Sequence, residues 1–130
     1  MAKTPRPKIL LGTTHTVLTG CGKMRVTVNW DFELNITEVF AKLGKSGGCA
    51  TVHVNSLTMF VTQAIRYGME IDAVVKRLRG ERCQSPAHDD SEEILSCEDG
   101  IGIVIERVHK ELAGIKDRKN KVANQKETTT

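Results

Sequence analysis

Hydrophobic and polar residues alternate in a segment near the N-terminus, which is the pattern of a half-buried β-strand. In residues 24–30 every second side chain is apolar, so these side chains share one face: Met24, Val26, Val28 and Trp30. Residues 14–19 are rich in Thr and Val, and Gly20-Cys21-Gly22-Lys23 supplies turn glycines between the two segments. The pattern predicts an antiparallel β-hairpin with Cys21 at its tip.

The following residues show the three- and four-residue hydrophobic spacing of helices. Asn35 can cap a short helix that runs to Leu43, with Glu38 completing the cap and Gly44 ending the helix. After a glycine-rich loop, a central buried helix is predicted to run as far as Gly68. The apolar residues of this helix are Val54, Leu57, Val61, Ala64 and Ile65.

Two further helices are predicted in the second half of the chain. Residues 71–78 carry a short amphipathic stripe that is closed by Gly80. Ser96-Cys97-Glu98-Asp99 has the form of a capping box for a last helix, whose apolar residues lie within 101–112. Between them, the polar segment 84–93 is expected to be a surface loop. The fold class is therefore α+β, with an N-terminal antiparallel β-hairpin or small sheet packed against three to four helices.

The length and charge of the chain define one folded unit with polar ends. A chain of 130 residues with 39% hydrophobic residues is enough for one domain with its own core. Residues 114–130 carry five of the 19 basic residues and two of the 16 acidic ones, so the remainder has 14 of each sign. We expect a mobile segment at 1–13, the domain at 14–113 and a basic, disordered tail at 114–130. Nucleic acid would contact only the tail.

The sequence has no secretory signal, and no apolar stretch approaches the roughly 18 residues that span a membrane. A cytoplasmic protein without a membrane partner is therefore expected. In that reducing compartment, four cysteines favour metal binding or free thiols over disulfides.

All four cysteines lie where glycine, proline or a helix boundary interrupts regular structure: Cys21, Cys49, Cys83 and Cys97. Zinc sites with four thiolates commonly take their ligands from such places. Cys97 would also lie at the positive end of a helix, which lowers the pKa of a thiol. The sequence contains no CxxC pair, so four free, buried thiols are an equal alternative. A redox role for Cys97 is a third hypothesis.

Two groups of residues are candidates for binding phosphate. Lys45, Ser46, Gly47 and Gly48 precede a helix and can present backbone N–H groups to an anion. Arg77, Arg79 and Arg82 cluster at the end of the short helix. The alternatives are a flexible turn that delivers Cys49 to a site, and a helix end whose charges face solvent.

Several segments together resemble the TSCPD domain family over about residues 14–112. They are Cys21-Gly22-Lys23, Gly44-Lys45-Ser46-Gly47-Gly48-Cys49, Arg77-Leu78-Arg79-Gly80-Glu81-Arg82-Cys83 and Ser96-Cys97-Glu98-Asp99. The family is found near the C-terminus of adenosylcobalamin-dependent ribonucleotide reductases and in small stand-alone proteins. Its four cysteines are proposed to bind metal, and all four match here. Leu95 and Glu98 depart from the Thr and Pro of the family's name-giving motif.

The resemblance implies an accessory domain with one structural zinc ion per chain, held by Cys21, Cys49, Cys83 and Cys97. Its partner would be a ribonucleotide reductase subunit or a nucleotide, and a homo-oligomer is consistent with so small a domain. We expect no catalysis by the chain alone, because it has neither a general acid and base pair nor an open metal motif such as HExxH. The alternative function is a free-standing protein that binds or sequesters nucleotides through the two phosphate-binding groups.

Overall fold

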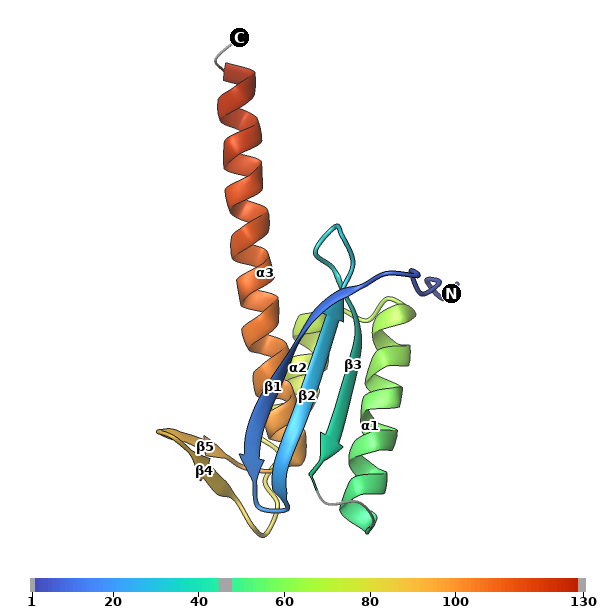
Figure 1. Ribbon diagram of the computed structural model, residues 1–130, viewed down its shortest axis with the longest axis vertical. Helices are drawn as coiled ribbons and strands as arrows, with labels where there is room; N and C mark the ends of the chain where they lie inside the picture. Colours follow the sequence, from blue (N-terminus) through green and yellow to red (C-terminus); the bar gives the residue numbers. More distant parts are fainter. Residues whose placement is uncertain (1, 45–47, 129–130) are drawn as a thin grey trace.

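A computed structural model describes residues 2–44 and 48–128 and has the expected α+β class. Three strands form an antiparallel sheet in the order β1 (Leu11–Thr19), β2 (Gly22–Trp30) and β3 (Ile36–Leu43). Helices α2 (Ile71–Leu78) and α3 (Cys97–Thr128) lie behind one face of this sheet and α1 (Cys49–Arg66) lies beside β3, as Figure 1 shows. A second, two-stranded sheet consists of β4 (Ala87–Asp89) and β5 (Glu92–Ile94).

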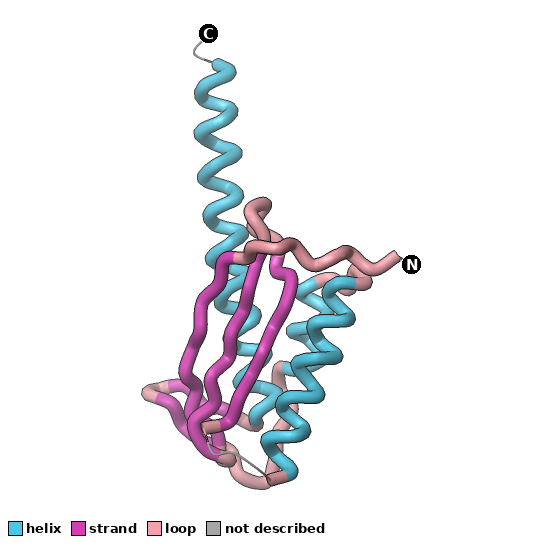
Figure 2. Tube along the Cα trace, turned by 45° about the vertical axis from the view of Figure 1, so that its right-hand side comes forward, coloured by secondary structure: helices cyan, strands magenta, loops and turns pink. Residues whose placement is uncertain are grey.

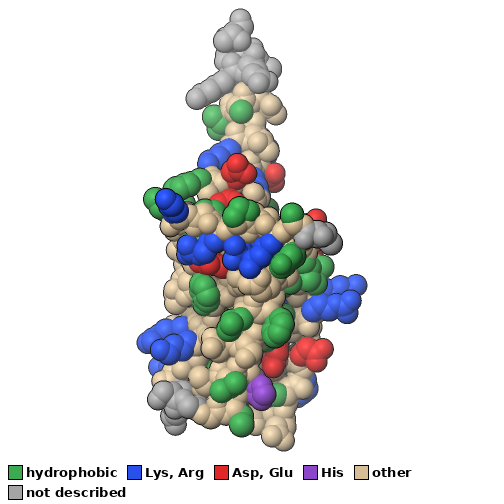
Figure 3. Space-filling view, turned by 90° about the vertical axis from the view of Figure 1, so that its right-hand side faces the viewer, with side chains coloured by type: hydrophobic (Ala, Val, Ile, Leu, Met, Phe, Trp, Pro, Cys, Tyr) green, Lys and Arg blue, Asp and Glu red, His purple; other side chains and the backbone are tan. Residues whose placement is uncertain are grey.

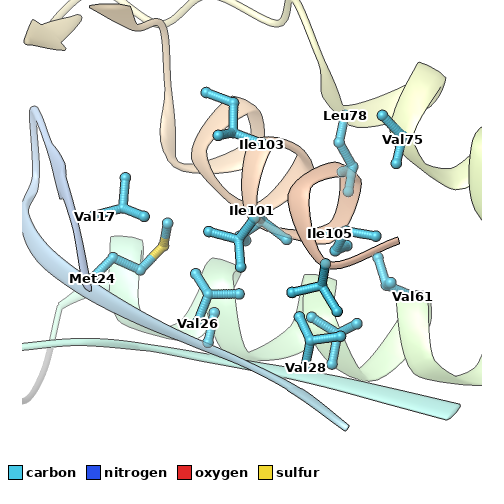
Figure 4. Packing of buried hydrophobic residues seen from close by; sticks show 14 of the residues in the cluster. Val17, Met24, Val26, Val28, Val61, Val75, Leu78, Ile101, Ile103 and Ile105 are labelled. Atoms are coloured by element: carbon cyan, nitrogen blue, oxygen red, sulfur yellow. The ribbon is translucent and has the colours of Figure 1, made fainter. Parts of the chain in front are cut away.

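The predicted N-terminal hairpin is confirmed. β1 and β2 pair in register from Leu11 opposite Trp30 to Thr19 opposite Gly22, so the turn contains Gly20 and Cys21. The alternating apolar side chains of β2 are buried against α3, and Figure 4 shows Ile101 facing this strand while Ile105 lies near Leu78 of α2. The hydrophobic core therefore lies between one face of the sheet and the first turns of α3.

The predicted short helix ending at Leu43 is wrong, because residues 36–43 form strand β3 beside β2. Ile36, Thr37 and Val39 are β-branched, which favours an extended backbone, and the sheet offers them a buried position. Glu38 caps no helix. Its carboxylate instead accepts hydrogen bonds from Arg6 and Asn29.

The helix predicted to end at Gly68 is present as α1, but it is not central. α1 lies along the outer edge of β3, as Figures 1 and 2 show. The Thr62 hydroxyl accepts a hydrogen bond from the N–H of Val39 at 3.0 Å and donates one to its carbonyl at 2.9 Å. One side chain thus satisfies both backbone groups at the sheet edge, while Met59 and Phe60 face solvent.

The two later helices follow the predicted pattern. α2 buries Val74, Val75 and Leu78 and packs against α3. Ser96 caps α3 by accepting a hydrogen bond from the Asp99 N–H at 3.0 Å. The Asp99 carboxylate accepts bonds from the N–H groups of Leu95 and Gly80 at 3.1 and 2.9 Å, so the capping box also joins α3 to the end of α2.

Three segments differ from the sequence-based description. The expected loop at 84–93 contains the β4–β5 hairpin, with Asp90 at a positive φ of 56° in its turn. Residues 114–128 continue α3, which extends away from the rest of the molecule (Figure 1). At the N-terminus, the Thr4 N–H donates to the Arg66 carbonyl at 2.9 Å, and β1 begins at Leu11. In the described part of the chain, no helix has the length and apolar character needed to cross a membrane.

Candidate functional site

The four cysteines belong to segments that meet at one end of the domain. Cys21 lies in the turn between β1 and β2, Cys49 and Cys97 are the first residues of α1 and α3, and Cys83 lies between α2 and β4. The hairpin turn and the first turns of α1 and α3 point to the same end of the molecule in Figures 1 and 2. Segments whose cysteines are up to 76 residues apart in sequence, from Cys21 to Cys97, therefore lie at the same end of the molecule.

Cys21 and Cys97 share a contact with the same side chain. Cys97 is only 8% exposed. The hydroxyl of Thr19 lies 3.6 Å from the Cys97 Sγ and accepts a hydrogen bond from the Cys21 N–H at 3.2 Å. It also donates to the Gly22 carbonyl at 2.8 Å. Thr19 thus positions the hairpin tip and both cysteines.

The segment that carries Cys83 packs against the same hairpin tip. A Cβ atom at position 20 would overlap the backbone oxygen of Ser85, so only glycine allows this approach. The Ser85 N–H donates to the Cys83 Sγ at 3.3 Å, and the Cys83 N–H donates to the Leu95 carbonyl at 3.0 Å. Cys83 is therefore held close to the turn that contains Cys21.

The electrostatic environment of Cys97 differs from the sequence-based expectation. Burial raises the pKa of its thiol to about 11, and the nearby Cys21 and Glu98 act in the same direction. The contact with the Thr19 hydroxyl acts in the opposite direction but is smaller. Burial therefore outweighs the helix end that was expected to lower this pKa. Without a metal, the thiol is protonated at neutral pH and is a poor nucleophile, which disfavours a redox role.

Cys49 is the fourth predicted ligand, and its position is less closely tied to those of the other three cysteines. Its thiol is exposed at the start of α1, after Gly48, whose φ of 88° gives the chain a sharp entry into the helix. The predicted anion-binding residues Lys45, Ser46 and Gly47 lie outside the described residues. Within 2–44 and 48–128, no three His, Cys, Asp or Glu side chains are grouped so that they could hold a metal ion. The donor chemistry fits zinc, because four thiolates are a usual closed zinc site.

The second predicted phosphate-binding group is only partly accessible. Arg79 donates to Asp99 at 3.1 Å and to Glu106 at 2.8 Å, so its guanidinium group joins the end of α2 to α3. Arg77 and Arg82 are exposed. Of the three arginines, Arg79 has a structural role that its position in the sequence does not reveal.

A comparison with known protein families identifies the family to which this chain belongs. The model of the TSCPD domain family matches residues 2–121, which is nearly the whole chain. The chain belongs to the TSCPD domain family. The TSCPD match includes residues on both sides of the 14–113 domain expected from the sequence. No curated protein and no solved structure matches the chain significantly.

Sequence reasoning missed three residues that shape the cysteine end of this TSCPD domain. Thr19 was assigned only to a strand, Gly20 only to a turn, and Ser85 only to a loop. Gly20 offered a signal, because a glycine in a turn can also mark a close approach of another backbone segment. The sequence alone does not say which segment approaches.

Proposed function

We propose that this TSCPD domain is a non-catalytic accessory module in which Cys21, Cys49, Cys83 and Cys97 hold one structural zinc ion. The observation that carries the proposal is that the Cys21 N–H and the Cys97 thiol both bond to the Thr19 hydroxyl, while the Cys83 segment packs against the same turn through Gly20 and Ser85. A zinc ion here would fasten the β1–β2 hairpin to the starts of α1 and α3.

Two features of the fold lie beside the predicted ligands. The Ser85 N–H already donates a hydrogen bond to the Cys83 Sγ. Cys49 and Cys97 are the first residues of α1 and α3, although for Cys97 burial outweighs the positive helix end. When bound, zinc would ionise its thiol ligands, and at Cys97 this effect would have to outweigh the burial that keeps the thiol protonated.

An accessory role agrees with the size of the chain and with the resemblance to the module of adenosylcobalamin-dependent ribonucleotide reductases. Within 130 residues there is no room for the reductase barrel and its cobalamin. We therefore propose a reductase subunit as the partner of the module. The alternative, a nucleotide-binding protein that uses Lys45–Gly48 and Arg77, Arg79 and Arg82, is weakened because Arg79 is already engaged with two carboxylates.

Cys49→Ser tests the zinc site most sharply, because the Cys49 thiol is exposed. In a protein without metal, such a surface substitution changes stability by less than about 0.5 kcal/mol. With a four-thiolate zinc site, it should lower the zinc content and reduce the Tm by about 5 °C or more. Zinc is measured by mass spectrometry on protein purified without added metal or an affinity tag. Thiol titration before and after chelation is the second measurement.

Ser56→Ala, at another exposed position of α1, is the matched control and should leave zinc content and Tm unchanged. Wild-type protein should contain about one zinc ion per chain, with thiols that react only after chelation. A metal-free wild type with four reactive thiols, together with a Cys49→Ser variant of unchanged Tm, would refute the proposal.

A further inference from the structure

The face of the three-stranded sheet that points away from α3 forms a cleft with the first turns of α1. The cleft has a volume of about 580 Å³, within the range of small-molecule sites. Arg25, Thr27, Phe40 and Lys42 line it from β2 and β3, and Val52 and Asn55 line it from α1. Figure 3 views the molecule from the side of α1 and shows hydrophobic side chains distributed over that side. The cleft uses none of the four cysteines.

Two cations stand directly opposite each other in this cleft. Arg25 of β2 pairs in register with Lys42 of β3, and both side chains are exposed. Like charges at directly opposite positions destabilise a sheet. Neither residue has a salt bridge in the described part of the chain, and Lys23 adds a third positive charge two residues before Arg25.

The surrounding residues do not neutralise these charges. Glu38 is the only acidic residue of the three strands, and its carboxylate is already bound by Arg6, at 2.9 and 3.0 Å, and by Asn29 at 2.8 Å. On the other wall, α1 has no acidic residue in its first turn and no side-chain cap. The positive end of this helix therefore adds to the field of Arg25 and Lys42.

The cleft also has an apolar wall. Phe40 is 48% exposed and Val52 is 61% exposed, although both are large hydrophobic side chains. An exposed aromatic ring can stack on a flat organic group. The guanidinium fork of Arg25 and the ammonium group of Lys42 are side chains of the kind that bind phosphate oxygens.

We propose that this cleft binds a small phosphate monoester with a flat organic group, the chemical class that includes mononucleotides. Arg25 and Lys42 bind the phosphate, and Phe40 and Val52 contact the flat group. This inference goes beyond the proposed zinc-holding function and does not rest on it. It also differs from the nucleotide-binding alternative, which uses Lys45–Gly48 and Arg77, Arg79 and Arg82.

The test is calorimetric titration of the full chain with adenosine 5′-monophosphate, adenosine and inorganic phosphate at low ionic strength. The double variant Arg25→Gln/Lys42→Gln should bind the monophosphate at least about tenfold more weakly than the wild type. The matched control Arg77→Gln/Arg82→Gln removes the same charge from the end of α2 and should bind within about twofold of the wild type. Thermal unfolding shows whether each variant is folded. The Tm of Arg25→Gln/Lys42→Gln should equal or exceed that of the wild type, because the repulsion is removed.

Wild-type protein should prefer the monophosphate over both adenosine and inorganic phosphate, and Phe40→Ala should reduce the preference over inorganic phosphate. Four results would overturn the proposal. Three of them are no binding of the monophosphate by the wild type, unchanged binding by folded Arg25→Gln/Lys42→Gln, and equal affinity for the monophosphate and inorganic phosphate. A single-stranded oligonucleotide whose affinity rises with its length would also overturn it, in favour of nucleic acid.

Discussion

Glu38 is a charged residue inside the sheet, and its partners explain how the fold tolerates it. Its side chain is 3% exposed, whereas that of Arg6 is 47% exposed. Burial alone would raise the pKa of Glu38, but the hydrogen bonds from Arg6 and Asn29 and the positive charges of Arg6 and Arg66 together hold it below its usual value. The ion pair therefore fastens the N-terminal segment to β3.

Replacing Glu38 with Gln should destabilise the protein at pH 7 by about 1 kcal/mol, since the partly exposed Arg6 can turn to water. A carboxylate whose pKa is lowered by folding stabilises the native state above its unfolded pKa of about 4.3, and this contribution is lost as the pH falls through the folded value. The difference between wild type and Glu38→Gln should therefore be largest above about pH 5 and should shrink as the pH falls below the unfolded pKa.

Urea unfolding at pH 7 and pH 3 measures this difference. Glu33→Gln is the matched control because Glu33 is exposed, and it should behave like the wild type at both pH values. A stability loss in Glu38→Gln that is the same at both pH values would contradict an electrostatic origin.

At the scale of single residues, the sequence identified the cysteines but not what surrounds them. The sequence predicts that a thiol at a helix start lies at the positive end of the helix dipole. The burial of Cys97 cannot be predicted in this way, because it depends on β1 and on the hydroxyl partner Thr19, which is 78 residues away. Glu38 was misassigned for the same reason. Its spacing from Asn35 suits a helix cap, and the arginine that binds it lies 32 residues earlier in the chain.

Among the elements, the contact between α1 and β3 gives the sharpest prediction. Thr62→Val keeps the shape of the side chain but leaves the buried N–H and carbonyl of Val39 without the hydroxyl, which should cost about 2 kcal/mol. Thr58→Val is the matched control, one turn earlier in the same helix. The Thr58 hydroxyl, also buried, bonds only to carbonyls of its own helix, at Val54 and Asn55.

Chemical denaturation of both variants should show Thr62→Val to be less stable than Thr58→Val by roughly 1–2 kcal/mol. Equal losses would mean that the Thr62 hydroxyl does not protect the edge of β3.

The elements themselves were predictable where one local pattern dominates. The alternation in β2 and the stripe of α2 each give one clear period, and both elements form as expected. Residues 36–43 carry competing signals, because a capping pattern precedes β-branched residues, and the neighbouring strand β2 decides the outcome. The same applies to β4 and β5, which are too short to show a period of their own.

The whole molecule combines a compact sheet and helix core with a single projecting helix. The first part of α3 is buried as far as Leu112, and Ile115 packs against the core. Lys116 donates to Asn35 at 2.9 Å. Beyond these contacts the helix extends roughly 20 Å further, at 1.5 Å per residue. The sequence revealed the polar, basic character of this segment, but not that the helix continues through it.

Removing residues 119–130 should leave the Tm within about 2 °C of the wild type, because the described side chains from 119 to 125 are exposed. Removing residues 113–130 should lower the Tm by several degrees, since this deletion also removes the Ile115 packing and the Lys116 bond to Asn35. Thermal unfolding of both truncated chains is the measurement. If the shorter deletion lowered the Tm, and did so more strongly at high protein concentration, a second copy of the chain would be packing on the projecting helix, because only an intermolecular contact makes the Tm depend on concentration.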